Sequence, residues 1–585
     1  MLYKELAKVY TELESTSKRL KKTLIISEFL KSAPATELPT LTLLLQGRLF
    51  PQWDERETGV ASRLVIKAIT TATGVSAKGI EDRWKKTGDL GSVAEEVIKS
   101  NKQETLFSSE LTIIKVFDNL RKLAELEGKG TVEKKLQLIS ELLLLAKPIE
   151  AKYITRTVLN DLRVGVGDGS IRDAIVWAFF SKDIGFTYNK KENDFKVEDR
   201  KKYNTYIDSV QQAYDITNDF SEIVETIRKK GLKGLNDIEL KPGHPIKVML
   251  ALKVNTIEEG FKKVGTPAEI EQKYDGFRIQ CHKHNNKITL FTRRLENVTN
   301  QFPEVVSYVK SNVEGDSFIL DSEAIGFNPK TNKCLPFQNI SQRIRRKFEI
   351  ERMTKEFPVE LNVFDIIFYN NKSMINESFK KRRELLEKII KPSERRIVLA
   401  KKIITSNKKE VEKFYQQSLK AGNEGIMLKT LDAPYKPGAR VGFMIKLKPV
   451  METLDLTIVG ADWGEGKRAK WMSSFTVACI DEEGSFLEIG KVGTGIKEKE
   501  EEGVSFKQLT KLLKPHIIAE KGRSIKLKPK VVIEIKYEEI QKSPTYSSGF
   551  ALRFPRLARI REDRKPDECS TLSMVKDFYK GQEKV

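Results

Sequence analysis

The chain has 585 residues, more than a single hydrophobic core usually organises, so we expect two to four domains. Its 104 lysines and arginines outnumber 82 aspartates and glutamates. The formal charge of +22 favours a polyanionic partner, nucleic acid above all, over a cationic substrate or an acidic protein surface. A charge-rich surface of the thermophile type explains the same balance equally well, so the motifs must decide.

Neither a membrane span nor a disulfide framework is expected. No apolar run approaches the roughly 20 residues that a membrane span needs, which predicts a soluble, unanchored protein. The four cysteines are far apart and form no CxxC pair, which argues against a zinc ribbon and favours a reducing cytoplasm. They are Cys281, Cys334, Cys479 and Cys569.

Three domains are predicted from the hydrophobic pattern along the chain. Residues 1–235 place apolar side chains three and four positions apart, as in Leu6 and Tyr10, which predicts an all-α domain. Residues 236–449 alternate short strands with helical segments and predict an α/β domain. Residues 450–585 contain strand-like runs joined by loops rich in glycine and lysine, which predicts a small β-barrel.

A glycine-rich loop, Asn160 to Ser170, precedes an apolar helix in the first domain. Ser170 and Asp173 have the spacing of a capping box at the start of that helix. Exposed amides there, aided by Arg163, predict a site for phosphate that does not read sequence. A purely structural loop with a good cap is the alternative. The candidate residues are Arg163, Gly167, Gly169 and Ser170.

The segment Glu271 to Arg278 carries the strongest chemical signal. Lys273 is predicted to end a strand, and Asp275-Gly276 is a hairpin turn signal. A lysine at a turn among other cations, partly desolvated, can supply the neutral amine of a nucleophile. A surface hairpin lysine without a catalytic role is the alternative. Strand alternation then places Phe277, Ile279 and Cys281 on one face, and Arg278, Gln280, His282 and His284 on the other.

Further motifs follow in a fixed order: Phe291 to Glu296, Leu320 to Ala324, Phe364 to Ile367, Glu424 to Lys429, Ile445 to Lys448, and Arg553 to Asp563. In this order the chain resembles the covalent nucleotidyltransferase superfamily, and most closely ATP-dependent DNA ligases of the archaeal and eukaryotic replicative type. The resemblance covers nearly the whole chain. It implies a helical DNA-binding domain, an adenylation domain and an OB-fold barrel. The implied function is sealing of single-strand nicks through lysyl-AMP, in replication, repair and recombination.

The resemblance also implies a role for each matching residue. Lys273 would be the catalytic nucleophile that takes AMP from ATP. Glu271 would accept from the adenine amino group, and Phe364 would stack on the base. Ribose and phosphate contacts are implied for Arg278, Arg293, Arg440, Lys446 and Lys448.

Metal and barrel residues follow from the same resemblance. Glu323 and Glu424 would hold Mg²⁺ or Mn²⁺. Glu323 would also contact the nucleotide. The barrel motif would orient pyrophosphate in the first step and then swing away about a hinge near Pro449 to Glu452. Its residues are Arg553, Arg556, Arg561 and Asp563.

The implied partner is nicked double-stranded DNA, held by the loop before residue 170, and the enzyme is expected to be a monomer. Gln103, Leu106 and Phe107 resemble a short clamp-binding peptide, which makes a sliding clamp a candidate partner. Core packing of Leu106 and Phe107 explains the pattern as well.

Two apparent motifs are set aside. Cys281 and His284 bracket a metal-like tract, but alternation turns Cys281 away from the histidines, and structural zinc needs about four ligands. Gly460 to Arg468 lacks the spacing and the Ser or Thr of a phosphate-binding P-loop.

The chain departs from the family pattern at two positions: Met444 stands where Trp is more frequent, and Arg564 stands where Lys is more frequent. These departures leave the choice among ATP, ADP and related donors open. An RNA ligase or mRNA-capping guanylyltransferase is the nearest competing enzyme, although the helical domain favours the DNA ligase. A non-catalytic nick-binding scaffold is the competing non-enzyme, and the intact lysines and glutamates argue against it.

Overall fold

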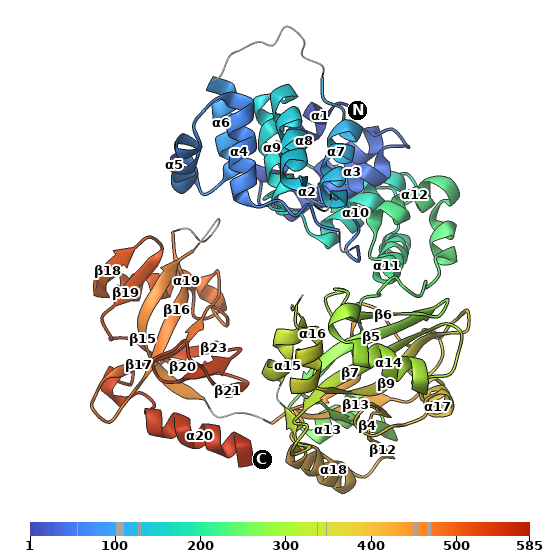
Figure 1. Ribbon diagram of the computed structural model, residues 1–585, viewed down its shortest axis with the longest axis vertical. Helices are drawn as coiled ribbons and strands as arrows, with labels where there is room; N and C mark the ends of the chain where they lie inside the picture. The colour runs from blue at the N-terminus through green and yellow to red at the C-terminus, as the bar shows by residue number, and fades with distance from the viewer. Residues whose placement is uncertain are drawn as a thin grey trace. The chain divides into compact units, whose positions relative to one another are not determined.

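The computed structural model describes residues 1–54, 56–100, 110–126, 128, 130–335, 337–344, 346, 348–449, 453–464, 468 and 470–584. These residues divide into two compact units. Figure 1 labels their helices and strands. The first unit holds residues 1–252, 263–406 and 428–445, and the second holds residues 253–262, 407–427 and 446–585.

Helices α1 to α12 build the N-terminal part of the first unit around one contiguous core. The face predicted for α1 is buried, and Tyr10 donates its hydroxyl to the carbonyl oxygen of Leu44 at 2.7 Å. The helices are Tyr3–Glu14, Arg19–Ser32, Leu38–Leu45, Ser62–Thr73, Ala77–Thr87, Leu90–Ser100, Ile113–Glu125, Thr131–Leu145, Pro148–Val158, Asp168–Phe179, Arg200–Thr217 and Phe220–Lys230.

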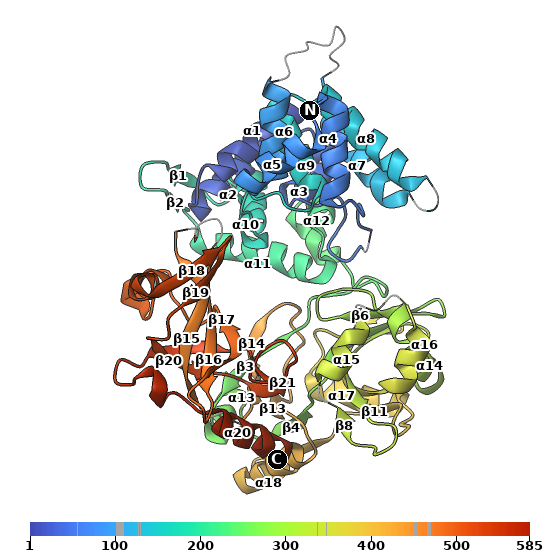
Figure 2. The same cartoon turned by 60° about the vertical axis from the view of Figure 1, so that its left-hand side comes forward.

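A small hairpin interrupts these helices, so the prediction of an all-α domain was incomplete. Strands β1 (Thr187–Asn189) and β2 (Asp194–Lys196) pair antiparallel (Figure 2). The hairpin covers Trp177, whose ring lies 4.5 Å from that of Phe186 and 5.0 Å from that of Phe195, measured between centroids. Strands of three residues are too short to be predicted from alternation of apolar and polar residues.

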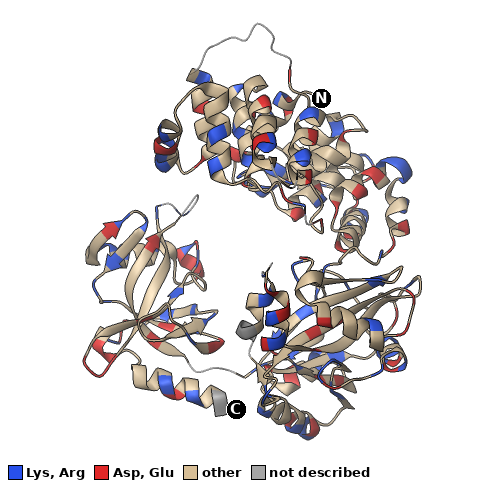
Figure 3. Cartoon of the chain, viewed as in Figure 1, with Lys and Arg blue, Asp and Glu red and all other residues tan. Residues whose placement is uncertain are grey.

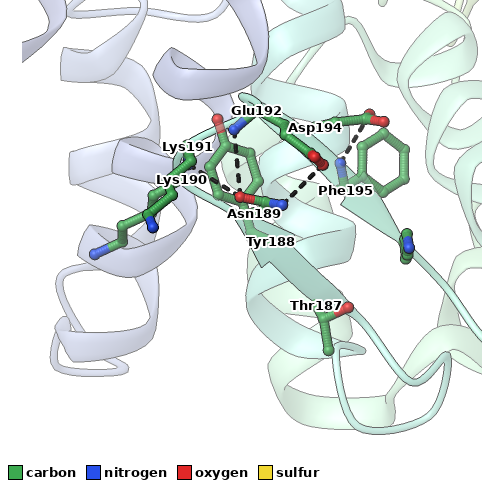
Figure 4. Close-up of a pocket in the computed structure, with 9 residues that line it drawn as sticks. Thr187, Tyr188, Asn189, Lys190, Lys191, Glu192, Asp194 and Phe195 are labelled. Carbon is green, nitrogen blue, oxygen red and sulfur yellow. Dashed lines mark hydrogen bonds between the residues drawn. The ribbon is translucent and has the colours of Figure 1, made fainter.

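A pocket of about 480 Å³ lies at this hairpin and is lined by its residues, from Thr187 to Lys196 (Figure 4). The turn satisfies its own polar groups, because the Asn189 side-chain oxygen accepts from the backbone N–H of Lys191 at 3.0 Å. No site residue predicted from the sequence lines this pocket.

The larger sheet of the first unit has the strand order β10-β9-β7-β5-β6, with β11 beside β9 and β8 beside β7. Phe277, Ile279 and Cys281 share one face of their strand, as predicted, and that face packs against Val305 and Val309 of helix α14 (Pro303–Asn312). The strands are β5 (Phe277–His284), β6 (Lys287–Thr292), β7 (Phe318–Phe327), β8 (Cys334–Leu335), β9 (Val359–Tyr369), β10 (Lys372–Ser373) and β11 (Ile397–Leu399). Nearby helices are α15 (Phe337–Ile344), α16 (Ile350–Glu356) and α17 (Phe379–Ile389).

A second sheet has the order β12-β4-β13-β14-β3. Strands β4 and β12 pair antiparallel, with Glu271 opposite Lys402. The strands are β3 (Leu250–Val254), β4 (Ala268–Lys273), β12 (Lys402–Thr405), β13 (Gly425–Thr430) and β14 (Arg440–Leu447). The accompanying helices are α13 (Ile257–Val264) and α18 (Lys408–Lys420).

The turn after Lys273 is not a hairpin, contrary to the prediction. Strand β4 belongs to the second sheet, whereas β5 pairs with β6 and β7 in the larger one. Asp275-Gly276 therefore carries the chain from one sheet to the other. A Cβ on Gly276 would lie 2.3 Å from the carbonyl oxygen of Ala324, so the glycine is needed for close approach to β7.

The second unit contains the predicted barrel. Strand β15 pairs with β16 along one edge and with β20 and then β19 along the other, as a closing sheet requires. The strands are β15 (Leu454–Trp463), β16 (Met472–Ile480), β17 (Phe486–Val492), β18 (Ile517–Lys521), β19 (Ser524–Leu527), β20 (Val532–Lys536), β21 (Glu539–Lys542), β22 (Phe550–Arg553) and β23 (Arg556–Ile560). Helices α19 (Phe506–Leu513) and α20 (Leu572–Lys584) complete it.

No helix within the described residues combines the length and the apolar character that a membrane crossing requires.

Candidate active site

Arg278 is held by several fixed partners. Its Nε donates to Oδ1 of Asp321 at 2.7 Å, and a second nitrogen pairs with Oδ2 of the same carboxylate. The hydroxyl of Tyr435 also donates to Asp321 Oδ2, at 2.9 Å. Burial alone would lower the pKa of Arg278, but the charge of Asp321 outweighs it and raises the pKa above its ordinary value. The guanidinium is thus fixed in place and always charged.

Glu271 lies on β4 two residues before Lys273 and is 2% exposed. The Nζ of Lys429, from β13, lies 2.5 Å from Glu271 Oε2. Lys429 is also buried, and its Nζ lies 4.9 Å from the ring centroid of Phe364. A carboxylate, an ammonium group and an aromatic face thus meet where β4, β13 and β9 face one another. Lys273 itself, at the end of β4, is half-buried.

Phe364 connects this cluster to Arg278, whose guanidinium carbon lies 5.3 Å from the ring centroid. The ring packs with Tyr274, Ile325 and Ala400 and stays partly accessible. An accessible aromatic face beside fixed polar groups is suited to a planar heterocycle.

Arg293 and Arg440 are exposed cations of the same unit, at the end of β6 and the start of β14. Partial burial and the charges of Arg278 and Arg440 lower the pKa of Arg293. Glu323 opposes this effect and stands opposite Arg278 in the β5–β7 register. Arg278, Arg293 and Arg440 provide cationic groups suited to phosphate oxygens.

Glu424 and Lys448 form an ion pair in the second unit. The Lys448 Nζ lies 2.7 Å from Glu424 Oε2 and 3.3 Å from Glu538 Oε2. Burial alone would lower the pKa of Lys448, but the neighbouring Glu424 raises it above its ordinary value. Lys446 lies two residues earlier, on the same face, and is half-buried.

The two predicted metal ligands are in different units, so the structure does not define their separation. Glu323 belongs to the first unit and Glu424 to the second. Within the described ranges, no group of three or more histidine, cysteine, aspartate or glutamate side chains is arranged so that it could hold a metal ion. Each carboxylate nevertheless offers the oxygen donors that Mg²⁺ prefers.

The barrel motif is held by carboxylates. Arg561 donates to Asp455 Oδ2 at 2.8 Å and grips Asp563 through two nitrogens, at 2.9 and 2.7 Å. Its hydrogen bonds lower the pKa of the Asp563 carboxyl. Arg553 pairs with Glu539 at 2.9 Å. Arg556 at the start of β23 is exposed.

The capping box predicted at the DNA-binding loop is wrong. Helix α10 begins at Asp168, with Gly167 as an N-cap that has no side-chain hydrogen bond. Ser170 is therefore already in the first turn, where it is buried, and Gly169 is half-buried. Asp173 pairs with Arg19 and Arg172 instead of capping.

Arg163, in the loop before α10, is exposed, and its Nε donates to Asp161 at 2.7 Å.

The apparent metal tract is divided between the two faces of β5. Cys281 faces the core, whereas His282 faces away from it and accepts from the backbone N–H of Gly243 at 3.1 Å. Burial lowers the pKa of His282 to about 3.

Some predictions lie outside the described residues: the clamp-binding candidates Gln103, Leu106 and Phe107, most of the hinge (450–452) and part of the loop at 460–468. Lys429 and Tyr435 belong to the site in the structure but were not predicted as site residues. Lys429 closes the Glu424 to Lys429 motif, which was a usable signal, whereas nothing in the local sequence marks Tyr435.

A strand-end lysine two residues after a buried carboxylate, in a unit that also carries an accessible aromatic face, is the arrangement expected of a nucleotidyltransferase. Family models match most of the chain: the DNA ligase N terminus over residues 2–176, the ATP dependent DNA ligase domain over 248–448, and the ATP dependent DNA ligase C terminal region over 468–564. The chain belongs to the ATP-dependent DNA ligases, enzymes that seal nicks in DNA.

Relatives that match over the full length of the chain support this family assignment. The DNA ligase of Nanoarchaeum equitans is 46% identical over 585 residues, covering 100% of this chain and 99% of that protein. The DNA ligase of Thermococcus fumicolans is 40% identical, with the same coverage of both chains. A solved structure titled Pmar-Lig_Pre has a TM-score of 0.55 at 17% identity and covers 95% of this chain and 99% of that one, a likeness of fold.

Proposed function

We propose that this DNA ligase works through Lys273 in three steps. The Lys273 amine attacks the α-phosphorus of ATP and pyrophosphate leaves, so that AMP is held as a phosphoramidate. The 5′-phosphate at a nick then attacks that AMP and displaces the lysine. Finally the 3′-hydroxyl attacks the adenylated 5′-phosphate and expels AMP. The observation that carries the proposal is the position of Lys273 at the end of β4, two residues after the buried Glu271.

Most of the proposed nucleotide contacts come from the first unit. Glu271 accepts from the adenine amino group, and Phe364 stacks on the base. Arg278 is fixed by Asp321, so it presents its charge to ribose or phosphate without reorganising. Arg293 and Arg440 extend this cationic surface, and Lys446 and Lys448 contact the α-phosphate.

Glu323 and Glu424 would hold Mg²⁺ or Mn²⁺, because such ions use one or two carboxylates together with substrate phosphates. When bound, the metal would offset the charge that develops on the transferred phosphate. Glu323 would also contact the nucleotide directly. The Glu424 carboxylate is paired with Lys448 in the nucleotide-free protein, so both side chains change partners when ATP binds.

The barrel residues Arg553, Arg556, Arg561 and Asp563 orient pyrophosphate during the first step. The carboxylates that hold Arg561 and Arg553 support this role, since they fix the direction of each guanidinium. After adenylation the barrel rotates away about the segment near Pro449 to Glu452, leaving the nick accessible.

Nicked duplex DNA is the substrate, and the helical domain holds its backbone. The uncapped N-terminus of α10 supports this assignment, because its amide groups attract phosphate. Gly167, Gly169 and Ser170 provide that backbone and Arg163 adds charge. Basic and acidic residues are intermixed along the ribbon in Figure 3, and the net charge of +22 favours DNA binding.

We also propose domain limits of residues 1–235, 236–449 and 450–585, which the three family matches support. A cytoplasmic monomer is proposed, and the four free thiols suit a reducing compartment. A sliding clamp remains a candidate partner through Gln103, Leu106 and Phe107.

The test is incubation with α-labelled ATP and a divalent metal, followed by denaturing separation and peptide mapping. Label on Lys273 is the expected result, and label on another residue or none would overturn the proposal. Parallel reactions with ADP and GTP define the donor, and capping of a diphosphate RNA end by GTP would assign a different enzyme.

A further inference from the structure

Strand β4 carries a second buried glutamate that the mechanism does not use. Glu269 lies two residues before Glu271, so both side chains project from the same face of the strand. They are 1% and 2% exposed. Two buried carboxyl groups side by side are costly unless their charges and hydrogen-bonding atoms find partners.

Cations from three neighbouring elements face this pair. Lys429 of β13 lies 2.5 Å from Glu271, and Lys402 of β12 lies 3.3 Å from Glu269. Arg383 of α17 is 3.7 Å from Glu271, beyond hydrogen-bond distance. Glu387, also on α17, shares Lys402 at 2.9 Å. The cations therefore lie close to the Oε2 atom of each carboxyl group, and in the part of the chain that the structure describes no cation lies within hydrogen-bond distance of either Oε1 atom.

The second oxygens remain unsatisfied. The Oε1 atoms of Glu269 and Glu271 are both buried, and among the described residues no hydrogen bond reaches either one. The two side chains are within hydrogen-bonding reach of each other. A single proton between them would satisfy both atoms at once, since a carboxylic acid donates where a carboxylate can only accept. Burial and the negative charge of Glu271 raise the pKa of Glu269 to about 7.

We propose that Glu269 is a positioning residue that holds a proton and donates it to Glu271, which fixes the plane of the Glu271 carboxylate for recognition of the adenine amino group. The inference rests on the proposed role of Glu271 in ATP binding. Loss of the proton places two carboxylates side by side, and their repulsion turns Glu271 from that orientation. Adenine recognition in this enzyme therefore weakens as pH rises through neutrality.

The test compares full-length wild-type protein with Glu269→Gln and Glu269→Leu in the rate of lysyl-adenylate formation at low ATP, from pH 6 to 9. The glutamine amide donates at every pH, so the ratio of its rate to that of wild type should rise from near one at pH 6 to about ten at pH 9, as expected for one hydrogen bond. Glu269→Leu should be slower than wild type at pH 6 and should discriminate less between ATP and GTP.

Glu387→Gln is the matched control, because it removes one negative charge from the same cluster without touching the carboxyl pair. Its rate ratio should stay flat with pH. A flat ratio for Glu269→Gln in folded protein would overturn the inference. Wild-type protein that forms no adenylate at any pH would instead overturn the proposed function.

Infrared spectroscopy of the nucleotide-free protein tests the proton without turnover. The difference spectrum, wild type minus Glu269→Gln, should show a protonated buried carboxyl at pH 6 that disappears by pH 9; the subtraction removes the contribution of Asp215, whose pKa is also raised by burial. Absence of that band from the difference spectrum at pH 6 would overturn the inference, and so would absence of any such band from wild type, even if the variants failed to fold.

Discussion

The Nζ of Lys448 lies 2.7 Å from Oε2 of Glu424, so a proposed phosphate-binding lysine and a proposed metal ligand neutralise each other in the nucleotide-free protein. Both side chains are largely buried, with 16% and 18% exposed. The pair keeps either charge from being buried alone, which would be strongly destabilising.

Glu424→Gln should raise the Mg²⁺ concentration needed for adenylate formation by about tenfold or more, because a neutral amide is a weaker ligand for a hard cation. The measurement is the adenylation rate as a function of Mg²⁺. Glu538→Gln is the control, since Glu538 also contacts Lys448 but is 48% exposed, and its curve should match wild type. An unchanged Mg²⁺ requirement in Glu424→Gln would remove this residue from the metal site.

Lys273→Ala should abolish labelling by ATP yet still seal a nick that already carries a 5′-adenylate, because only the first two steps use the lysine. Ligation of both substrates, measured on gels, tests the prediction. Lys283→Ala provides a control, since that lysine lies on β5 and binds the carbonyl of Gly315. Failure of Lys273→Ala on the adenylated nick would show a role for Lys273 beyond the nucleophile.

Lys429→Ala should destabilise the first unit by about 3 kcal/mol, because it leaves the Glu271 carboxylate buried without its close cation. Thermal unfolding followed by tryptophan fluorescence should report a clear loss of stability. The double variant with Glu271→Gln should recover part of it, since the uncompensated charge is then removed. A change in stability below about 0.5 kcal/mol, the range of ordinary surface substitutions, would mean that water or another group compensates Glu271.

Asp215→Asn should stabilise the first unit at pH 8 but not at pH 4. Burial raises the pKa of Asp215 from 3.8 to about 6, despite the nearby Lys247. The unfolded chain releases this proton at lower pH, so stability falls between about pH 4 and 6 and stays reduced above that range. The gain at pH 8 should be about 1–3 kcal/mol. Asp208→Asn, exposed on the same helix, should change stability little at either pH; an equal gain would point to general charge effects.

Gly167→Asp should stabilise helix α10 by a few tenths of a kcal/mol and yet weaken binding of nicked DNA several-fold. Gly167 has extended backbone angles and open space for a side chain, so aspartate can cap the helix. The same carboxylate would repel a phosphate at that N-terminus. Gly167→Ser caps without charge and should bind DNA like wild type. Equal DNA affinity of the aspartate and serine variants would exclude this N-terminus from the interface.

The sequence by itself determined the features that depend on local periodicity. Alternation placed Phe277 and Cys281 on the buried face of β5 and Arg278 on the other, because successive side chains of a strand point to opposite sides. It also predicted Lys273 at a strand end, and the spacing of Leu6 and Tyr10 predicted the buried face of α1.

Tertiary structure decided which strands meet. A turn signal at Asp275-Gly276 cannot tell a hairpin from a crossover, because that choice depends on pairing with β7 and β12, which lie far along the chain. The contact of Lys429 with Glu271 likewise joins strands more than 150 positions apart. Helix α10 begins with Gly167 as its N-cap, and Asp173 pairs with Arg19 and Arg172, one of which lies far along the chain. Local pattern fixes the direction of a side chain along its own element, whereas its partner is set by the packing of the whole unit.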